Sequence, residues 1–199
     1  MNAVGFLLLV VIAIGVYVFS AYNKFVTIKT RIKASIQEIG NQLKRQADLI
    51  PNLVSSVKGY MKHENKIFKD LTEARKSIMN AVKTGDAKKM VDASEMAAKA
   101  FGPIQAVFES TPQLKAAGPT VKLMDELRDT SDKTMYSRRT LIDLSADYNV
   151  MVVRFPTNLI ANMFGFKEEA GLKMPEGAEK EATEVKKEEL KTPKVDLEK

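Results

Sequence analysis

The stretch AVGFLLLVVIAIGVYVFSAY, residues 3–22, decides how the rest of this chain is arranged. It contains no charged residue and is dominated by valine, leucine, isoleucine and phenylalanine. A helix of this length rises about 30 Å, the thickness of the hydrocarbon core of a bilayer. A shorter apolar run could be a core helix, but one this long without a charge is typical of a membrane span. We therefore expect residues 1–22 to form a transmembrane helix.

The charges around this stretch predict its orientation. Only two uncharged residues precede it, and the basic residues that follow it before the first acidic residue are Lys24, Lys29, Arg31 and Lys33. Basic residues close to a span are retained in the cytoplasm, so the N-terminus should lie outside and residues 23–199 inside. A secretory signal cleaved near Ser20 is the alternative, but such signals have a basic start and a shorter apolar core.

Apolar residues repeat at alternating steps of three and four over the next fifty residues, interrupted only by Gln46 and Glu64. The repeat consists of Ile32, Ile36, Ile39, Leu43, Ile50, Leu53, Val57, Tyr60, Ile67, Leu71, Ala74 and Ile78. This period is typical of helices packed side by side. Residues 24–166 contain no strand-like alternation. We predict an all-α fold in which residues 23–166 form an antiparallel up-and-down bundle.

Pro51 leaves the number of helices open. Inside a helix it would remove the hydrogen bond to the Ala47 carbonyl and cost roughly 3 kcal/mol. At a helix start it is harmless, and Asp48 is a good N-cap. The unbroken apolar repeat favours one kinked helix and hence three long helices in the bundle. The capping chemistry favours a break near residues 47–48 and hence four, and we adopt the break.

Later boundaries are marked by glycine, proline and capping residues. Thr84-Gly85-Asp86 should end one helix and cap the next, and Ser110-Thr111-Pro112 should end that one. The last long helix should have an apolar seam made of Met124, Leu127, Leu141, Tyr148, Val152 and Phe155, with Ser131, Thr134 and Arg138 as its polar middle. A short apolar piece, residues 159–166, either caps the bundle or lies at the membrane interface. Residues 167–199, rich in Glu and Lys, should form a disordered tail.

Charge and composition restrict the possible functions. Residues 24–166 carry a net charge of +8, which suits anionic lipid headgroups or nucleic acid, although the even spacing of the lysines argues against one binding face. The chain has one histidine and no cysteine, so no ordinary zinc site can form within it. His63-Glu64 lacks the second histidine of a zinc protease, and no glycine-rich phosphate loop occurs. We expect no metal, cofactor, small-molecule substrate or catalytic residue.

The stretch QLKRQADLIPNLV, residues 42–54, followed by VKGYMKHE, residues 57–64, resembles the LemA family of bacterial membrane proteins. Weaker similarities follow in the same order: Tyr22-Asn23, ESTPQLK at 109–115, Tyr148-Asn149, FPTNLIA at 155–161 and PKVD at 193–196. The sequence departs from the family where Leu141-Ile142-Asp143 replaces the usual Tyr-Asn-Asp. The resemblance implies an inner-membrane anchor, a cytoplasmic helical bundle and no established enzymatic activity. It also suggests a membrane zinc protease as an associate.

The family-like motif contains the candidate partner patch. We assign to it Lys44, Arg45, Asp48, Pro51, Asn52 and Tyr60. Lys44 or Arg45 could pair with Asp48 one turn away, and such a surface pair alone would contribute at most about 1 kcal/mol. We interpret the protein as a scaffold or adaptor that binds other proteins at the membrane, with oligomers possible and the end of the tail, residues 193–197, as a second docking segment.

Overall fold

The computed structural model describes residues 3–60 and 65–169, and every regular element in those ranges is a helix. In chain order the helices are α1 (Ala3–Val57), α2 (Asn65–Thr84), α3 (Ala87–Ser110), α4 (Pro112–Ala116), α5 (Gly118–Val153) and α6 (Thr157–Phe164). The predicted all-α class is confirmed. The predicted tail from residue 170 onward and the His63-Glu64 pair lie outside the described residues.

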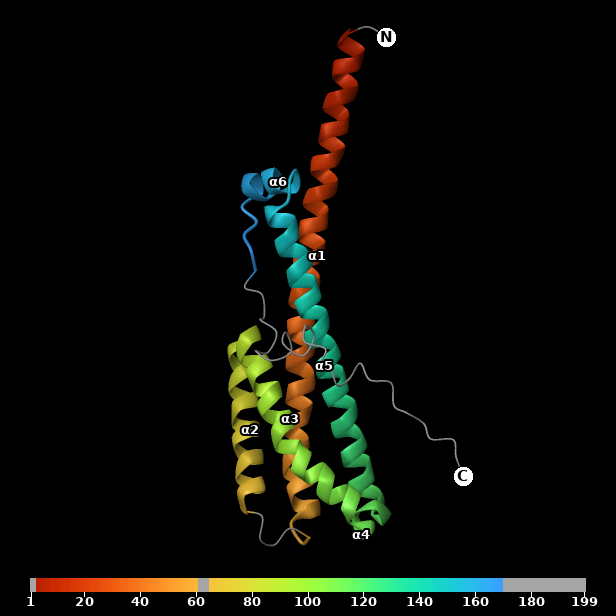
Figure 1. Ribbon diagram of the computed structural model, residues 1–199, viewed down its shortest axis with the longest axis vertical. Coiled ribbons are helices and arrows are strands. Elements are labelled where there is room, and N and C mark those ends of the chain that lie inside the picture. Colours follow the sequence, from red (N-terminus) through yellow and green to blue (C-terminus); the bar gives the residue numbers. More distant parts are fainter. Residues whose placement is uncertain (1–2, 61–64, 170–199) are drawn as a thin grey trace, which may run out of the picture.

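The first part of α1 projects beyond the rest of the molecule (Figure 1). It contains a stretch long and apolar enough to cross a membrane, and the rest of the chain buries none of that stretch. Exposed there are Val4, Phe6, Leu7, Leu8, Leu9, Val10, Val11, Ile12, Ile14, Val16 and Phe19. Soluble proteins rarely expose so much contiguous apolar surface. Its natural surroundings are lipid acyl chains, and the protein is membrane-anchored through this helix.

The four long helices form an antiparallel up-and-down bundle, as predicted (Figure 1). α2 and α3 flank only the half of α1 that lies far from the N-terminus, whereas α1 and α5 continue beyond them as a pair. α6 lies across the end of that pair. We call the four-helix part the membrane-distal section (residues 39–57 and 118–141 with α2, α3 and α4). We call residues 21–32 and 145–169 the membrane-proximal section.

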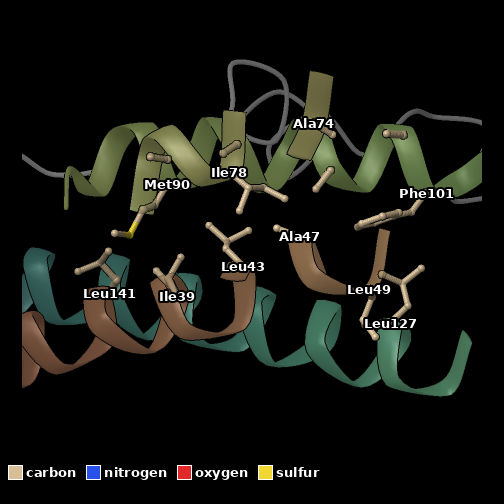
Figure 2. Close-up of a cluster of buried hydrophobic side chains, with 14 of the residues drawn as sticks. Ile39, Leu43, Ala47, Leu49, Ala74, Ile78, Met90, Phe101, Leu127 and Leu141 are labelled. Carbon is tan, nitrogen blue, oxygen red and sulfur yellow. The ribbon is translucent and has the colours of Figure 1, made fainter. Parts of the chain in front are cut away.

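The core of the membrane-distal section is mainly aliphatic, with Phe101 and Phe108 of α3 as its buried rings. Figure 2 shows side chains from all four long helices pointing toward one another, among them Leu43, Ile78, Met90 and Leu141. None of these four side chains is more than 4% exposed. Burying one large aliphatic side chain contributes roughly 1.5–3 kcal/mol, so the bundle is held together mainly here. The apolar repeat therefore identified the buried face of the helices correctly.

The predicted helix break near residues 47–48 is wrong. α1 continues through Pro51 to Val57, so Asp48 caps no helix. The structure supplies a physical reason: the Arg75 side chain of α2 donates a hydrogen bond from Nε to the Ala47 carbonyl, 3.1 Å away. That carbonyl is the acceptor that Pro51 cannot serve. The chain instead turns after Val57, at residues 58–60, where Gly59 lies.

Most other predicted boundaries are confirmed. Asp86 caps α3 by accepting a hydrogen bond from the Lys89 amide at 2.9 Å, and Gly85 has a φ of +66°, which favours glycine. The seam of the last helix is buried from Met124 to Tyr148. Phe155 is an exception: α5 ends at Val153, and the Phe155 ring is 73% exposed instead of lying on the seam.

Candidate interaction surface

The six residues of the predicted patch are all exposed. Lys44, Asp48, Pro51 and Asn52 lie one turn apart along α1, because positions three and four apart share a helix face. We call these four residues the α1 strip. Tyr60 is 53% exposed but lies in the turn after α1, beyond the end of the strip. The structure therefore places five of the six residues on one rigid helix, and four of these form the α1 strip.

Arg45 belongs to a different contact. Its guanidinium donates a hydrogen bond from Nη2 to Glu126 Oε1 of α5 at 2.7 Å, and does not pair with Asp48 as considered above. The hydrogen bond and the charge of Glu126 raise the pKa of Arg45. Because both side chains are exposed, the pair tethers α1 to α5 only weakly. Among the described residues, no carboxylate lies within 4.0 Å of Lys44, and no cation lies that close to Asp48.

The polar middle of α5 is buried at Thr134 and half-buried at Ser131 and Arg138, and it makes its hydrogen bonds to other helices. Gln46 of α1 donates hydrogen bonds to the hydroxyls of Ser131 and Thr134, at 3.3 and 3.4 Å. Arg138 donates a hydrogen bond to Glu95 of α3 at 2.6 Å and forms an ion pair with it between the two helices. A groove of about 260 Å³ opens beside these residues. Arg138 and Glu95, two of the three charged residues that line it, already pair with each other across the helices, so we assign this groove to helix register.

The membrane-proximal section holds a cluster of aromatic rings from three distant parts of the chain. The Phe25 ring of α1 meets the Tyr148 ring of α5 edge-on, with centroids 5.7 Å apart and an interplanar angle of 85°. It stacks on the Phe166 ring, with centroids 4.7 Å apart and an interplanar angle of 14°. Tyr22 contacts Phe164 at 4.8 Å and Phe166 at 5.7 Å. Each well-placed aromatic pair adds about 0.5–1.5 kcal/mol to the stability of the fold, beyond the effect of burying its apolar surface. Sequence reasoning missed this cluster because its members belong to no common helical repeat.

Hydrogen bonds fix the residues that follow α6. Gly165, with a φ of +71°, reverses the chain so that the Phe166 amide bonds the Ala161 carbonyl at 2.9 Å. The Asn149 side chain then donates to the Glu169 carbonyl and accepts from the Glu169 amide, both at 2.9 Å. Glu169, which lies in the segment predicted to be a disordered tail, is therefore held against α5. The Asn149 in the Tyr148-Asn149 motif has a visible structural role.

Tyr148 combines full burial with an unpaired hydroxyl. Its side chain is 0% exposed, and the hydroxyl has no hydrogen-bond partner within the described part of the chain. Burial raises the pKa of Tyr148, because a phenolate would lose its hydration; nearby Lys29 lowers it and Glu169 raises it. A phenol held neutral among aromatic rings serves packing here.

The described residues offer no evident metal centre. No group of three or more His, Asp or Glu side chains close enough to hold an ion occurs in residues 3–60 and 65–169. The exposed basic residues are also dispersed over all four long helices, with Arg45, Lys76, Lys99 and Lys122 as examples. A dispersed charge of this kind does not outline a nucleic-acid groove.

Comparison with known proteins supports the family resemblance. The sequence model of the LemA family matches residues 35–186. The magnetosome protein MamQ of Magnetospirillum gryphiswaldense is 24% identical, with an alignment that covers 73% of this chain and 62% of that protein. MamQ 1 and MamQ 2 of Paramagnetospirillum magneticum are each 23% identical, covering 80% of this chain and 69% of theirs. The chain thus spans less than two thirds of the first of these relatives.

Proposed function

This chain belongs to the LemA family, and from that premise we propose that it is a membrane-anchored adaptor, without catalytic activity, that binds proteins through the α1 strip. The bundle presents the strip, and the N-terminal part of α1 restricts it to the membrane surface. In bacteria the anchor would cross the inner membrane, with the bundle in the cytoplasm, because the basic residues that follow the span favour that side.

The observation that carries this proposal is the continuity of α1. The strip lies on the same unbroken helix as the membrane span, so its distance from the span along the helix is fixed. At 1.5 Å per residue, Lys44 lies about 33 Å and Asn52 about 45 Å from Tyr22 along the helix. A partner must therefore reach this far from the membrane. A membrane protease with a cytoplasmic domain is one class of protein that meets this requirement.

The chemistry of the strip fits protein recognition. Lys44 and Asp48 offer charges of both signs, Asn52 adds an amide, and Pro51 offers an apolar ring between them. A surface with both charges suits another folded protein better than a polyanion, which would be repelled by the carboxylate. The alternative is binding of nucleic acid. The described basic residues are dispersed and form no single face for it.

The test is photo-crosslinking in the membrane. A photoreactive side chain at position 44, 52 or 60 should capture the same partner, whereas one at exposed Lys76 on α2 should not. Asp48→Lys should abolish most of the captured product, because it reverses the only negative charge in the strip. Asp92→Lys makes the same change at an exposed position of α3 and serves as the matched control.

Two results would contradict the proposal. One is equal capture from position 76 and from position 44. The other is a captured product that survives Asp48→Lys unchanged while the helix content of the variant matches that of the parent.

A further inference from the structure

α6 exposes an apolar face that the bundle does not cover. Residues 155–166 contain no charge at all. Ile160 and Ala161 of α6 are buried against the bundle, but Leu159 is 59% exposed, Met163 63% and Phe164 47%. Leu159 and Met163, four residues apart, therefore share the uncovered face of the short helix, whereas Phe164 lies on the side of Ile160 and Ala161, next to Tyr22 of α1. In water this face would leave a large apolar surface hydrated.

The position of α6 shows what covers this face. α6 lies across the membrane-side end of the α1–α5 pair and beside α1, not along the bundle (Figure 1). The Phe164 ring contacts Tyr22 at 4.8 Å, and together with Gly15, Val18 and Phe19 of α1 these rings line an apolar hollow of about 370 Å³. The exposed face of α6 is thus continuous with the lipid-facing surface of α1.

The depth of α6 agrees with the thickness of a bilayer. Residues 3–22 span about 30 Å, so Val18, Phe19 and Tyr22 lie in the last 6 Å or so of that length. Aromatic rings such as Tyr22 are typical of this boundary. Basic side chains follow just beyond it: Lys24, Arg154 and Lys167 are all exposed, and the last two directly flank the uncharged segment. Such side chains suit lipid phosphates.

We propose that α6 lies in the interfacial layer of the bilayer and forms a second membrane contact, with Leu159 and Met163 inserted among the upper parts of the acyl chains. Interfacial helices bury their apolar face about 5–10 Å into this layer, which is the depth at which α6 meets α1. A single spanning helix allows the bundle to rotate about its axis and to tilt. A second contact beside it restrains the rotation. The inference is independent of the α1 strip and of any protein partner.

The absence of cysteine in the chain allows a direct test. Single cysteines are placed at Met163, at Ile12 in the span and at Met135, which is 67% exposed on the part of α5 that lies in the membrane-distal section. Each full-length variant is labelled with an environment-sensitive fluorophore and reconstituted in vesicles of phosphatidylcholine and phosphatidylglycerol. Quenching is then measured with aqueous iodide, with nitroxide in the headgroup and with nitroxide deep in the acyl chain.

The label at position 163 should be quenched by iodide several-fold less than the label at 135. It should be quenched more by the headgroup nitroxide than by the deep one, whereas the label at 12 should show the opposite preference. Leu159→Asn should restore iodide access at 163, and Tyr136→Asn, at an exposed ring on the distal part of α5, should leave it unchanged. Helix content measured for each variant excludes unfolding as the cause.

Equal iodide quenching at 163 and 135 would overturn the proposal. So would protection at 163 that disappears when labelled protein is diluted to about one molecule per vesicle, because that result would mean a second copy of the chain covers α6. Protection that persists on dilution supports the lipid contact.

Discussion

The two sections of the bundle are built from different side chains and on different principles. The membrane-distal section packs aliphatic residues of four helices in a regular repeat, with Leu43 and Ile78 fully buried in it. The membrane-proximal section has two long helices, and in place of α2 and α3 it has stacked aromatic rings around Phe25 and a short crossing helix, α6. The difference teaches that, where only two long helices meet, large rings and a closing element extend the buried core beyond what aliphatic residues such as Ile28 and Ile32 provide.

The largest expected effect is at the centre of the aromatic cluster. Phe25→Ala removes a ring that is 0% exposed and contacts Tyr148 and Phe166. We expect the free energy of unfolding to fall by about 3–5 kcal/mol. Hydrogen exchange should accelerate in α6 and in residues 145–153, and much less in α2 and α3. Urea unfolding and exchange mass spectrometry of the full chain in micelles measure both.

Leu43→Ala is the counterpart in the membrane-distal section. It should cost about 2–5 kcal/mol and accelerate exchange in α2 and α3 first. Its matched control is Lys44→Ala, at the exposed neighbouring position, which should stay within about 0.5 kcal/mol of the parent. If Phe25→Ala and Leu43→Ala accelerate the same amides, the bundle unfolds as one unit and the two sections are not energetically distinct.

A smaller effect concerns the hydrogen bond that lets α1 pass through Pro51. Arg75→Met removes the donor to the Ala47 carbonyl and should cost about 1 kcal/mol. In a Pro51→Ala background the new amide can donate to that carbonyl, so the same change should cost almost nothing. The resulting coupling, about 1 kcal/mol in a double-mutant cycle, is the quantity to measure. Lys76→Met, at the next exposed position, should show no coupling to Pro51.

The smallest expected effect is on the pH dependence of folding stability, and it arises from Tyr148 in the membrane-proximal section. Because burial raises the pKa of Tyr148, the unfolded chain ionises this phenol first, and stability is lost as the pH rises above about 10.0, the ordinary value. Tyr148→Phe should remove that part of the alkaline loss. At neutral pH it should be neutral or stabilising by up to about 1 kcal/mol, since the lost hydroxyl has no partner in the described structure.

The measurement is urea unfolding of parent and variant between pH 7 and 11, where lysines affect both equally. Tyr136→Phe, at a ring 74% exposed, is the control and should keep the full alkaline loss. A parallel pH dependence in the parent and Tyr148→Phe would show that the phenol is hydrated in the folded state.

The sequence predicted the membrane-distal section well and the membrane-proximal section poorly, for physical reasons. A repeat of three and four reports which face of a helix is buried, so Ile39, Leu43 and Leu71 were placed correctly. It cannot report contacts between chain segments more than a hundred residues apart, such as Phe25 with Phe166. The sequence showed the Tyr148-Asn149 motif, but not that Asn149 would bond the backbone of Glu169, which follows α6.

Pro51 shows a second limit of sequence reasoning. Considered with their neighbours alone, Asp48 and Pro51 favour the start of a new helix. The helix persists because Arg75, on another helix, supplies the missing donor. In the candidate patch, exposure was predictable from the repeat, whereas the pairing of Arg45 with Glu126 depends on how α5 lies against α1. Both the continuity of α1 through Pro51 and the pairing of Arg45 depend on contacts with other helices.

Because α1 is unbroken, a tilt of its membrane span also moves the far end of the bundle sideways. Spanning helices tilt when the bilayer around them becomes thinner. From Tyr22 to Val57 the helix extends about 52 Å, so each additional tilt of about 10° would swing its far end sideways by about 9 Å. With no hinge between the span and the bundle, a change in membrane thickness becomes a lateral displacement several times larger than the change itself.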